Sequence, residues 1–465
     1  MTAGAGGAAA ALEGCETDLR YLNQISGWQG AWPAAWSVFG TADRDARAAM
    51  VARWADAPAA LQADMEALRR GIANGTSAPK PVVRRILDQT DGLAAALAAG
   101  APGADEAPQD DETAAWRTLF NEEIGPAIDR YRKFLRNDYL PYANDRIGLF
   151  AIDDSGRCFE NAVRFWTSLD LSAEEIETRG RAILEETTAD FLAHAKTPRR
   201  RLKAALDHYR APYDGGPVTG DDLIAVSEAA IARAREAMPR QFRAYDIAPI
   251  QIVEMAAHRR SSSPAGYYLP AAGGSASYVI NPSRAAERRL MAEVIAFHEA
   301  IPGHHLNSEV TARSGGGGRF NSGYAEGWAI YAEYLAVEAG LYSSDYDRTG
   351  MIAKHLWAAS RLVIEPGIHL HGWSRDQAIA FMREHSAMPE AEIALEIDRY
   401  IAMPAQSLSY MLGYLEFRDM RRRAEAALGE KFDIREFHHV VMAGGVRELA
   451  AVAADVERWI EAGGG

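Results

Sequence analysis

Apolar residues recur at the spacing of an α-helix along most of this chain, and this periodicity limits the folds that it can adopt. Each Ala-rich segment with apolar side chains at positions i, i+3, i+4 and i+7 predicts a helix with one buried face. Pro58 and Pro126 fall inside two segments, and each predicts either two shorter helices or one kinked helix. The predicted helical segments are Asp45–Ile72, Val82–Ala99, Trp116–Leu140, Ala173–Ala195, Gly220–Ala237, Ala285–Ala300, Tyr324–Ala339, Arg375–Glu384 and Tyr410–Leu428.

Patterns typical of β-strands are scarce. Tyr267–Asn281 (YYLPAAGGSASYVIN) has aromatic and β-branched residues on both sides of a Gly-Gly pair, which predicts a hairpin. Ile250–Met255 is a second, weaker strand candidate, and the run SGGGG at Ser314–Gly318 predicts an exposed loop. The sequence therefore predicts a mainly α fold with a very small hairpin or sheet.

Charge and cysteine content exclude several classes of protein. The 465 residues carry 50 Lys and Arg against 64 Asp and Glu, a net charge of −14, which argues against binding to nucleic acid or to an anionic membrane. The two cysteines, Cys15 and Cys158, are too few for a disulfide framework or a Cys-based zinc site. Met1–Ala11 lacks the basic start and apolar stretch of a secretory signal, and we expect residues 1–12 to be disordered. These features predict a cytoplasmic protein.

The stretch Ala296–Val310 (AFHEAIPGHHLNSEV) carries the strongest chemical signal. His298 and Glu299 open like the H-E-x-x-H zinc helix, but Pro302 stands where the second histidine belongs. A two-residue bulge at Pro302 and Gly303 would bring His304 to that place, with His305 as the alternative ligand. Paired histidines at a helix end also serve as capping or solvated groups. The neighbouring apolar face favours metal binding.

A third ligand is available on the helix predicted at Tyr324–Ala339. Glu326 lies 22 residues after His304 among apolar neighbours, where a buried carboxylate needs a partner. Two His and one Glu with an open fourth position are typical of hydrolytic zinc sites. Glu333 is the alternative ligand, and a helix-surface or outer-shell role suits it better. The sequence therefore predicts one Zn²⁺ held by His298, His304 and Glu326.

These motifs resemble the large bacterial family called domain of unknown function 885, and the resemblance implies a relation to the gluzincin metallopeptidases. It implies a large multi-helix, metallopeptidase-like fold with a deep cleft and the small sheet near the zinc helix. Two departures, Glu365-Pro366 for Asp-Thr and Ala405 for Gly, bear on substrate preference. The matching stretches are HEAIPGHH, YAEGWAIYAEYL, Arg130–Leu149, Arg361–Met382, Glu396–Phe417 and Phe432–Gly445.

Roles follow from chemistry and from this resemblance. Glu299 is the expected general base, which takes a proton from water and delivers it to the leaving amine. The resemblance makes Tyr410 the candidate oxyanion donor, with Tyr414 as the alternate and a core aromatic as the competing role. Arg361, His369 and Arg399 are candidate substrate-binding residues. Glu365 and Asp398 stand close in sequence to the two arginines, so a structural ion pair is the competing interpretation.

The leading hypothesis is a zinc-dependent hydrolase of amide bonds, most simply a peptidase acting on short peptides. The alternatives are a hydrolase of a non-peptide amide or biosynthetic intermediate and a non-catalytic metal-binding protein. Neither nucleic acid nor membrane is an expected partner. Because the motifs must converge on one cleft, residues 13–465 are predicted to form one helical unit. Within it, residues 13–129 are an N-terminal subdomain and residues 130–465 are the catalytic region.

Overall fold

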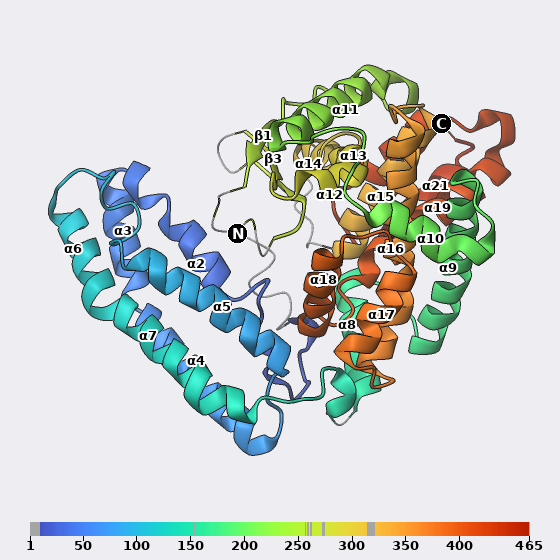
Figure 1. Ribbon diagram of the computed structural model, residues 1–465. Coiled ribbons are helices and arrows are strands. Elements are labelled where there is room, and N and C mark those ends of the chain that lie inside the picture. Colours follow the sequence, from blue (N-terminus) through green and yellow to red (C-terminus); the bar gives the residue numbers. More distant parts are fainter. Residues whose placement is uncertain are drawn as a thin grey trace. The chain divides into compact units, whose positions relative to one another are not determined.

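A computed structural model describes residues 10–152, 154–255, 257, 260, 263–271, 275–313 and 321–464 (Figure 1). The fold is mainly α with one small three-stranded sheet, which confirms the predicted class. The Gly-Gly pair of the hairpin and the Ser314–Gly318 run lie outside the described residues. So do residues 1–9 of the stretch expected to be disordered, whereas Ala11 and Leu12 at its end are buried.

The chain divides into two compact units, which are described separately. Unit 1 comprises Met1–Phe159, Ile368–Arg375 and Asp398–Pro404, and unit 2 comprises the remaining segments, Glu160–Gly367, Asp376–Ile397 and Ala405–Gly465. The expected boundary between residues 129 and 130 falls inside unit 1.

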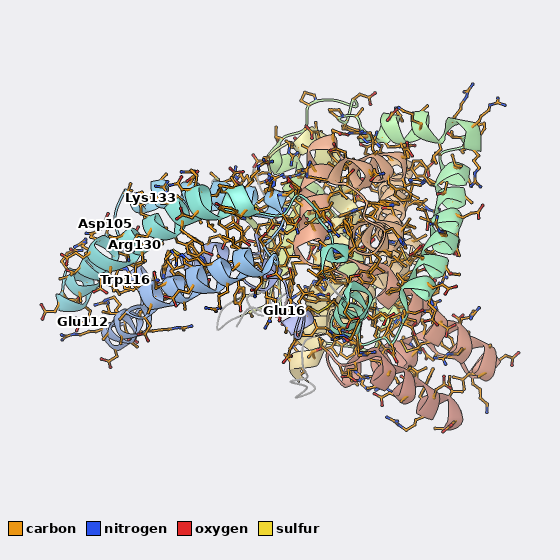
Figure 2. The ribbon with its side chains drawn as sticks, turned by 90° about the horizontal axis from the view of Figure 1, so that it is seen from below. Glu16, Asp105, Glu112, Trp116, Arg130 and Lys133 are labelled. Carbon is orange, nitrogen blue, oxygen red and sulfur yellow. A yellow bond between two sulfur atoms is a disulfide. The ribbon has the colours of Figure 1, made fainter. Side chains whose placement is uncertain are left out.

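Unit 1 is held together by aromatic side chains between its helices. Trp36 packs edge-on against Phe120 with ring centroids 4.9 Å apart, and Phe39 stacks on Trp116 at 4.5 Å. Figure 2 shows Trp116 at one end of this group of helices, far from Glu16. The helices of unit 1 are α2 (Trp28–Trp36), α3 (Arg44–Trp54), α4 (Ala57–Asn74), α5 (Lys80–Leu97), α6 (Asp111–Leu119) and α7 (Gly125–Phe134).

The two prolines resolve in different ways. Pro58 occupies the first turn of α4, after α3 has ended at Trp54, so the predicted segment Asp45–Ile72 is two helices. Pro126 occupies the first turn of α7, which continues α6 through a π-helical turn at Phe120–Ile124. Proline needs no donor partner in a first turn, so Pro58 is favourably placed. Pro126 lies inside a continuous helical stretch, where proline removes one main-chain hydrogen bond, and it follows the π-helical turn directly.

Cys15 and Cys158 form a disulfide within unit 1. Two cysteines are too few for a framework of several disulfides, as the sequence indicated, but they form this one bridge, which no sequence pattern predicted. The bridge joins residues 143 positions apart and ties the N-terminal segment to the start of α8 (Ser155–Thr167).

Unit 2 is centred on two helices whose backbones touch. Gly327 on α15 and Gly413 on α19 face one another, and a Cβ atom on either would collide with the opposite backbone. The helices wholly or mainly in unit 2 are α8, α9 (Ala173–His194), α10 (Leu202–Arg210), α11 (Gly220–Gln241), α12 (Ala285–Arg288), α13 (Ala292–Glu299), α14 (His304–Arg313), α15 (Ser322–Glu338), α16 (Asp345–His369), α17 (Arg375–Glu384), α18 (Glu390–Ala402), α19 (Leu408–Leu428), α20 (Ile434–Ala443) and α21 (Leu449–Glu461).

The sheet of unit 2 contains β1 (Gln251–Glu254), β2 (Gly266–Leu269) and β3 (Ser277–Ile280) in the order β1-β3-β2. Strands β2 and β3 are antiparallel, with Tyr268 opposite Tyr278, which confirms the predicted hairpin. Strand β1 runs parallel to β3 and confirms the second strand candidate. Strand β2 is consequently an edge strand of this sheet.

None of the helices in the described part of the chain combines the length and apolar composition needed to cross a bilayer.

Candidate metal centre

The first two candidate ligands come from consecutive helices separated by a tight turn. Helix α13 ends at Glu299 and α14 begins at His304, so the chain has two helices here rather than one helix with a bulge. A Cβ atom at Gly303 would collide with the carbonyl oxygens of His298 and Phe297. Only glycine lets the backbone return this closely, and the return brings His304 beside His298. Their rings are 4.8 Å apart and nearly perpendicular.

Three side chains converge at this turn. His298, His304 and Glu326 each offer one ligand atom, and these atoms lie within 4.8 Å of one another. Glu326 Oε2 lies 3.3 Å from His298 Nε2 and 3.5 Å from His304 Nε2. The structure therefore brings together the three residues that the sequence singled out.

His305 points elsewhere. Its Nε2 lies 2.8 Å from the carbonyl oxygen of Ala248, and its Nδ1 lies 3.3 Å from the hydroxyl of Tyr268. Both ring nitrogens are thus occupied by hydrogen bonds. This geometry favours His304 over His305 as the second ligand, an alternative that the sequence left open.

Glu326 has the properties of a ligand. Burial opposes its ionisation, but the neighbouring His298 and His304 hold the pKa of Glu326 below its ordinary range. Its Oε2 atom is buried and makes no well-aligned hydrogen bond, which is costly for a carboxylate oxygen. A cation between the three side chains would remove that cost, and two imidazoles with one carboxylate match the donors that Zn²⁺ prefers.

Behind His298 lies a second buried carboxylate, Glu333, seven residues after Glu326 on α15. Its Oε1 lies 2.7 Å from His298 Nδ1 and 2.5 Å from Lys354 Nζ, and its Oε2 lies 2.8 Å from His355 Nε2. Burial of the His298 imidazole opposes protonation, and so does Lys354, but the two glutamates outweigh both and raise the pKa of His298. Glu333 therefore contacts the far nitrogen of His298 rather than the point where the three candidate ligands meet, as the sequence allowed.

Lys354 and His355 were missed by sequence reasoning. They are 6% and 1% exposed and lie in the middle of α16, between Ala353 and Leu356. Two adjacent basic residues with apolar neighbours on both sides are the signal that could have identified them, because buried cations need partners.

Glu299, the expected base, is the last residue of α13 and is 8% exposed. Among the described residues its carboxylate has no hydrogen bond or ion pair, whereas the nearby Glu333 has three partners. A carboxylate without such partners is available to hydrogen-bond to a water molecule or a substrate.

Tyr410 is also near the cluster. Its ring lies 6.2 Å from the ring of His298, nearly parallel to it. Arg361 is 2% exposed, and its guanidinium lies 4.4 Å from the Tyr410 ring and 4.0 Å from the Trp357 ring. Arg361 also pairs with Glu396 at 3.4 Å, a partner that the sequence did not suggest. The geometry thus gives Arg361 a supporting contact with Tyr410.

The alternate tyrosine, Tyr414, stacks on Tyr334 with centroids 4.8 Å apart.

The other two candidate substrate-binding residues belong to unit 1. His369 is fully buried, with Nε2 3.1 Å from the carbonyl oxygen of Tyr400 and Nδ1 accepting a hydrogen bond from the Leu149 amide. Arg399 is half-buried and lies over the Tyr400 ring at 5.0 Å. Within unit 1 both therefore have structural contacts.

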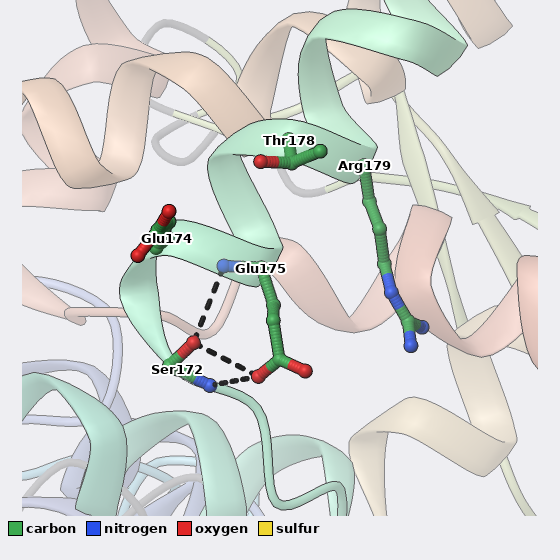
Figure 3. Close-up of a pocket in the computed structure, with 5 residues that line it drawn as sticks. All are labelled: Ser172, Glu174, Glu175, Thr178 and Arg179. Atoms are coloured by element: carbon green, nitrogen blue, oxygen red, sulfur yellow. Dashed lines mark hydrogen bonds between the residues drawn. The ribbon is translucent and has the colours of Figure 1, made fainter.

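A surface hollow at the start of α9 is unrelated to the metal cluster. Figure 3 shows Ser172 and Glu175 hydrogen-bonded to one another there. These bonds form a capping box, which satisfies the first amides of the helix. The polar groups of this hollow thus have a structural role. Its lining residues are Ser172, Glu174, Glu175, Thr178 and Arg179.

Comparisons with known proteins agree with this fold. A family described as "Bacterial protein of unknown function (DUF885)" matches residues 5–456. A solved "putative lipoprotein" from Colwellia psychrerythraea has a TM-score of 0.85 and 22% identity, and the match covers 95% of this chain and 80% of that chain. A "putative lipoprotein of unknown function" from Shewanella oneidensis has a TM-score of 0.67 and 18% identity, covering 92% and 84%. Among curated proteins none matches the sequence.

The descriptions of these two structures contradict the cytoplasmic location predicted from the sequence, because a lipoprotein is attached to a membrane through lipid. The cytoplasmic prediction is therefore wrong. The prediction rested on the low cysteine count and on the lack of a signal-like pattern in Met1–Ala11. The disulfide shows that a low cysteine count does not indicate the cytoplasm here.

Proposed function

This chain belongs to the DUF885 family of bacterial proteins of unknown function, and we propose that it is a zinc-dependent hydrolase of amide bonds. The observation that carries the proposal is the convergence of His298, His304 and Glu326, whose ligand atoms lie within 4.8 Å of one another. Two imidazoles and one carboxylate leave a fourth coordination position open, which is typical of hydrolytic rather than structural zinc sites. We further propose that the site is related to that of gluzincin metallopeptidases.

The protein's own residues supply the proton transfers. A bound Zn²⁺ polarises a carbonyl group and makes water a stronger nucleophile. Glu299 takes the proton from the attacking water and delivers it to the leaving amine, since its carboxylate is not engaged by another described residue. The Tyr410 hydroxyl donates a hydrogen bond to the carbonyl oxygen as negative charge develops there. Arg361 holds the Tyr410 ring by stacking on it.

Short peptides are the substrate class that we propose. Strand β2 is an edge strand, and its Tyr268 ring lies 6.3 Å from the ring of the ligand His304. An extended peptide can add to such an edge through main-chain hydrogen bonds, which places its backbone beside the metal centre. Leu269 on the same strand is 44% exposed and offers an apolar contact for a substrate side chain.

We infer that the protein acts outside the cytoplasm. Disulfides persist in oxidising compartments and are rare in cytosolic proteins, and this chain has one. Both similar structures are described as lipoproteins, which supports the same location.

Two adjacent histidines provide the test of the metal site. His304→Ala should lose stoichiometric Zn²⁺, measured by elemental analysis of purified protein, because it removes a ligand. His305→Ala is the matched control and should retain zinc, since His305 bonds to Ala248 and Tyr268 instead. Loss of zinc in the control alone would overturn the ligand assignment.

Glu299→Gln tests the chemistry. The variant should keep zinc but lose about 10²–10⁴-fold in turnover of a dipeptide-to-pentapeptide library, because it cannot accept a proton. Zinc-loaded wild-type protein that cleaves no peptide would overturn the peptidase assignment, and cleavage of non-peptide amides would then identify the alternative substrate class. Unchanged turnover in the variant would overturn the role of Glu299.

A further inference from the structure

One helix reaches both nitrogens of the His298 imidazole. Glu326 and Glu333 are seven residues apart on α15, two helical turns, and therefore share one face of that helix. Glu326 Oε2 lies 3.3 Å from His298 Nε2, and Glu333 Oε1 lies 2.7 Å from His298 Nδ1. The imidazole thus has one carboxylate beside its ligand nitrogen and the other carboxylate hydrogen-bonded to its second nitrogen.

The oxygen that faces His298 Nδ1 is shared with a cation. Lys354 Nζ lies 2.5 Å from Glu333 Oε1 and only 3.2 Å from His298 Nδ1. Two donors so close together do not bond to each other when both carry protons, so each donates to Oε1. This arrangement fixes the proton of neutral His298 on Nδ1 and leaves the Nε2 lone pair directed toward His304 and Glu326.

Because Lys354 shares Oε1 of Glu333, Glu333 donates less negative charge to the His298 imidazole. A carboxylate that accepts a hydrogen bond from a metal-bound histidine raises the basicity of that ligand. An ammonium on the same oxygen withdraws part of this charge. We infer that Lys354 is a positioning residue that weakens the donation from Glu333 to His298, so that a bound metal ion keeps its Lewis acidity at the expense of affinity. This inference rests on the proposed function.

The charge balance of the buried cluster acts in the same direction. The carboxylates of Glu299, Glu326 and Glu333 and the ammonium of Lys354 together carry two net negative charges when the histidines are neutral. Replacing Lys354 by a neutral side chain leaves three negative charges in a poorly solvated region, and a divalent cation is then more strongly attracted. Removal of this lysine should therefore tighten metal binding, whereas removal of a merely structural residue would loosen it.

Zinc affinity tests the inference without any substrate. In competition with a chromophoric chelator, Lys354→Met should bind Zn²⁺ about tenfold more tightly than the wild type, whereas Lys354→Arg should bind as the wild type does. The visible absorption of the Co²⁺-loaded Lys354→Met protein should shift, because the field of the His298 ligand changes. Unchanged or weaker zinc binding by Lys354→Met would overturn the inference.

If Lys354→Met alone fails to fold, the test uses Glu333→Gln and the double variant that combines Glu333→Gln with Lys354→Met. Glu333→Gln alone should weaken zinc binding about 10–100-fold, as the loss of an outer-shell partner does. In the Glu333→Gln background, adding Lys354→Met should tighten zinc binding by less than the gain of about tenfold expected in the wild type, because only the direct effect of the lost positive charge remains. An equal or larger gain in that background would overturn the inference. Wild-type protein that binds no zinc would overturn the proposed function itself, and zinc-binding protein that cleaves nothing leaves the affinity comparison valid.

Discussion

Two buried carboxylates, Asp18 in unit 1 and Glu333 in unit 2, differ in their partners and in their preferred charge state. In unit 1, Asp18 is 3% exposed and accepts a hydrogen bond from the Tyr139 hydroxyl, and burial raises the pKa of Asp18 to about 6. Burial also raises the pKa of Asp64 on α4 to about 6. In unit 2, burial opposes ionisation of Glu333, but Lys354 and two histidines hold the pKa of Glu333 below its ordinary range.

The difference lies in the partners rather than in the depth of burial. A hydroxyl donates one hydrogen bond and no charge, so Asp18 still carries an energetic cost when ionised. Cationic and imidazole partners remove that cost for Glu333. Asp18 therefore has the electrostatics of a scaffold residue, whereas Glu333 stays charged beside the candidate metal ligands. If this distinction is correct, changes in unit 1 should alter stability and leave zinc affinity unaffected.

The largest such effect should come from the disulfide. Replacing Cys15 and Cys158 by serine should lower the free energy of unfolding of unit 1 by about 4–5 kcal/mol, since the bridge closes a loop of 143 residues in the unfolded chain. Urea unfolding followed by tryptophan fluorescence measures the loss. Zinc affinity, measured in the absence of urea, should match the wild type. A parallel loss of zinc binding would mean that the two units are not separable in this way.

A smaller effect should follow pH. The folded-state pKa of Asp18, about 6, exceeds its ordinary value of 3.8, so folding favours the protonated form. The resulting stability is fully present below about pH 4 and is lost as pH rises through about 6, a change of about 3 kcal/mol. Glu333, with its lowered pKa, contributes in the opposite sense, and its contribution is lost as pH falls.

Asp18→Asn is the matched variant for this prediction, because it keeps an oxygen acceptor for the Tyr139 hydroxyl. Thermal melting between pH 4 and pH 8 should show a flatter profile than the wild type. A profile as steep as that of the wild type would assign the pH dependence to other groups, Asp64 first among them.

The smallest effect lies in unit 2 and tests a turn. Ala405 has a φ of 64°, a conformation that favours glycine, while its amide donates to Glu365 Oε2 at 2.9 Å. Ala405→Gly should stabilise the protein by about 0.5–1 kcal/mol, the difference between relieved strain and added chain entropy. Ala426→Gly, at an exposed position of α19, should instead destabilise it by about 1 kcal/mol. Equal effects of the two variants in thermal melts would show that the turn is unstrained.

The sequence predicted most of the helices and the convergence of His298, His304 and Glu326, because both depend on local patterns. His298 and His304 lie on either side of a short turn, and Glu326 lies on the helix that follows. Few other residues near them in the sequence could therefore act as metal ligands. Helix α16 was not predicted, since Gly350, Pro366 and Gly367 interrupt its pattern. Lys354 and the Cys15–Cys158 bridge depend on how distant segments pack, and no local spacing encodes that.

The departures from the family pattern at Glu365 and Ala405 acquire a physical meaning in the structure. Glu365 Oε1 also accepts a hydrogen bond from the Ser407 hydroxyl at 2.6 Å, so its side chain holds the turn before α19 at two points. The sequence had associated these positions with substrate preference. Their contacts show a role in fixing the start of the helix that carries Tyr410.

The glycine contact between α15 and α19 bears on attempts to redesign the site. Gly327 and Gly413 meet backbone to backbone, and neither can be replaced by a larger residue without a collision. The spacing of the two helices, and with it the position of Glu326 relative to Tyr410, cannot be changed at this contact. Strand β2 has no such backbone contact at Tyr267 and Leu269, which are half-buried and 44% exposed, respectively. A library intended to change selectivity while sparing the ligands should therefore vary β2 and leave the helix pair untouched.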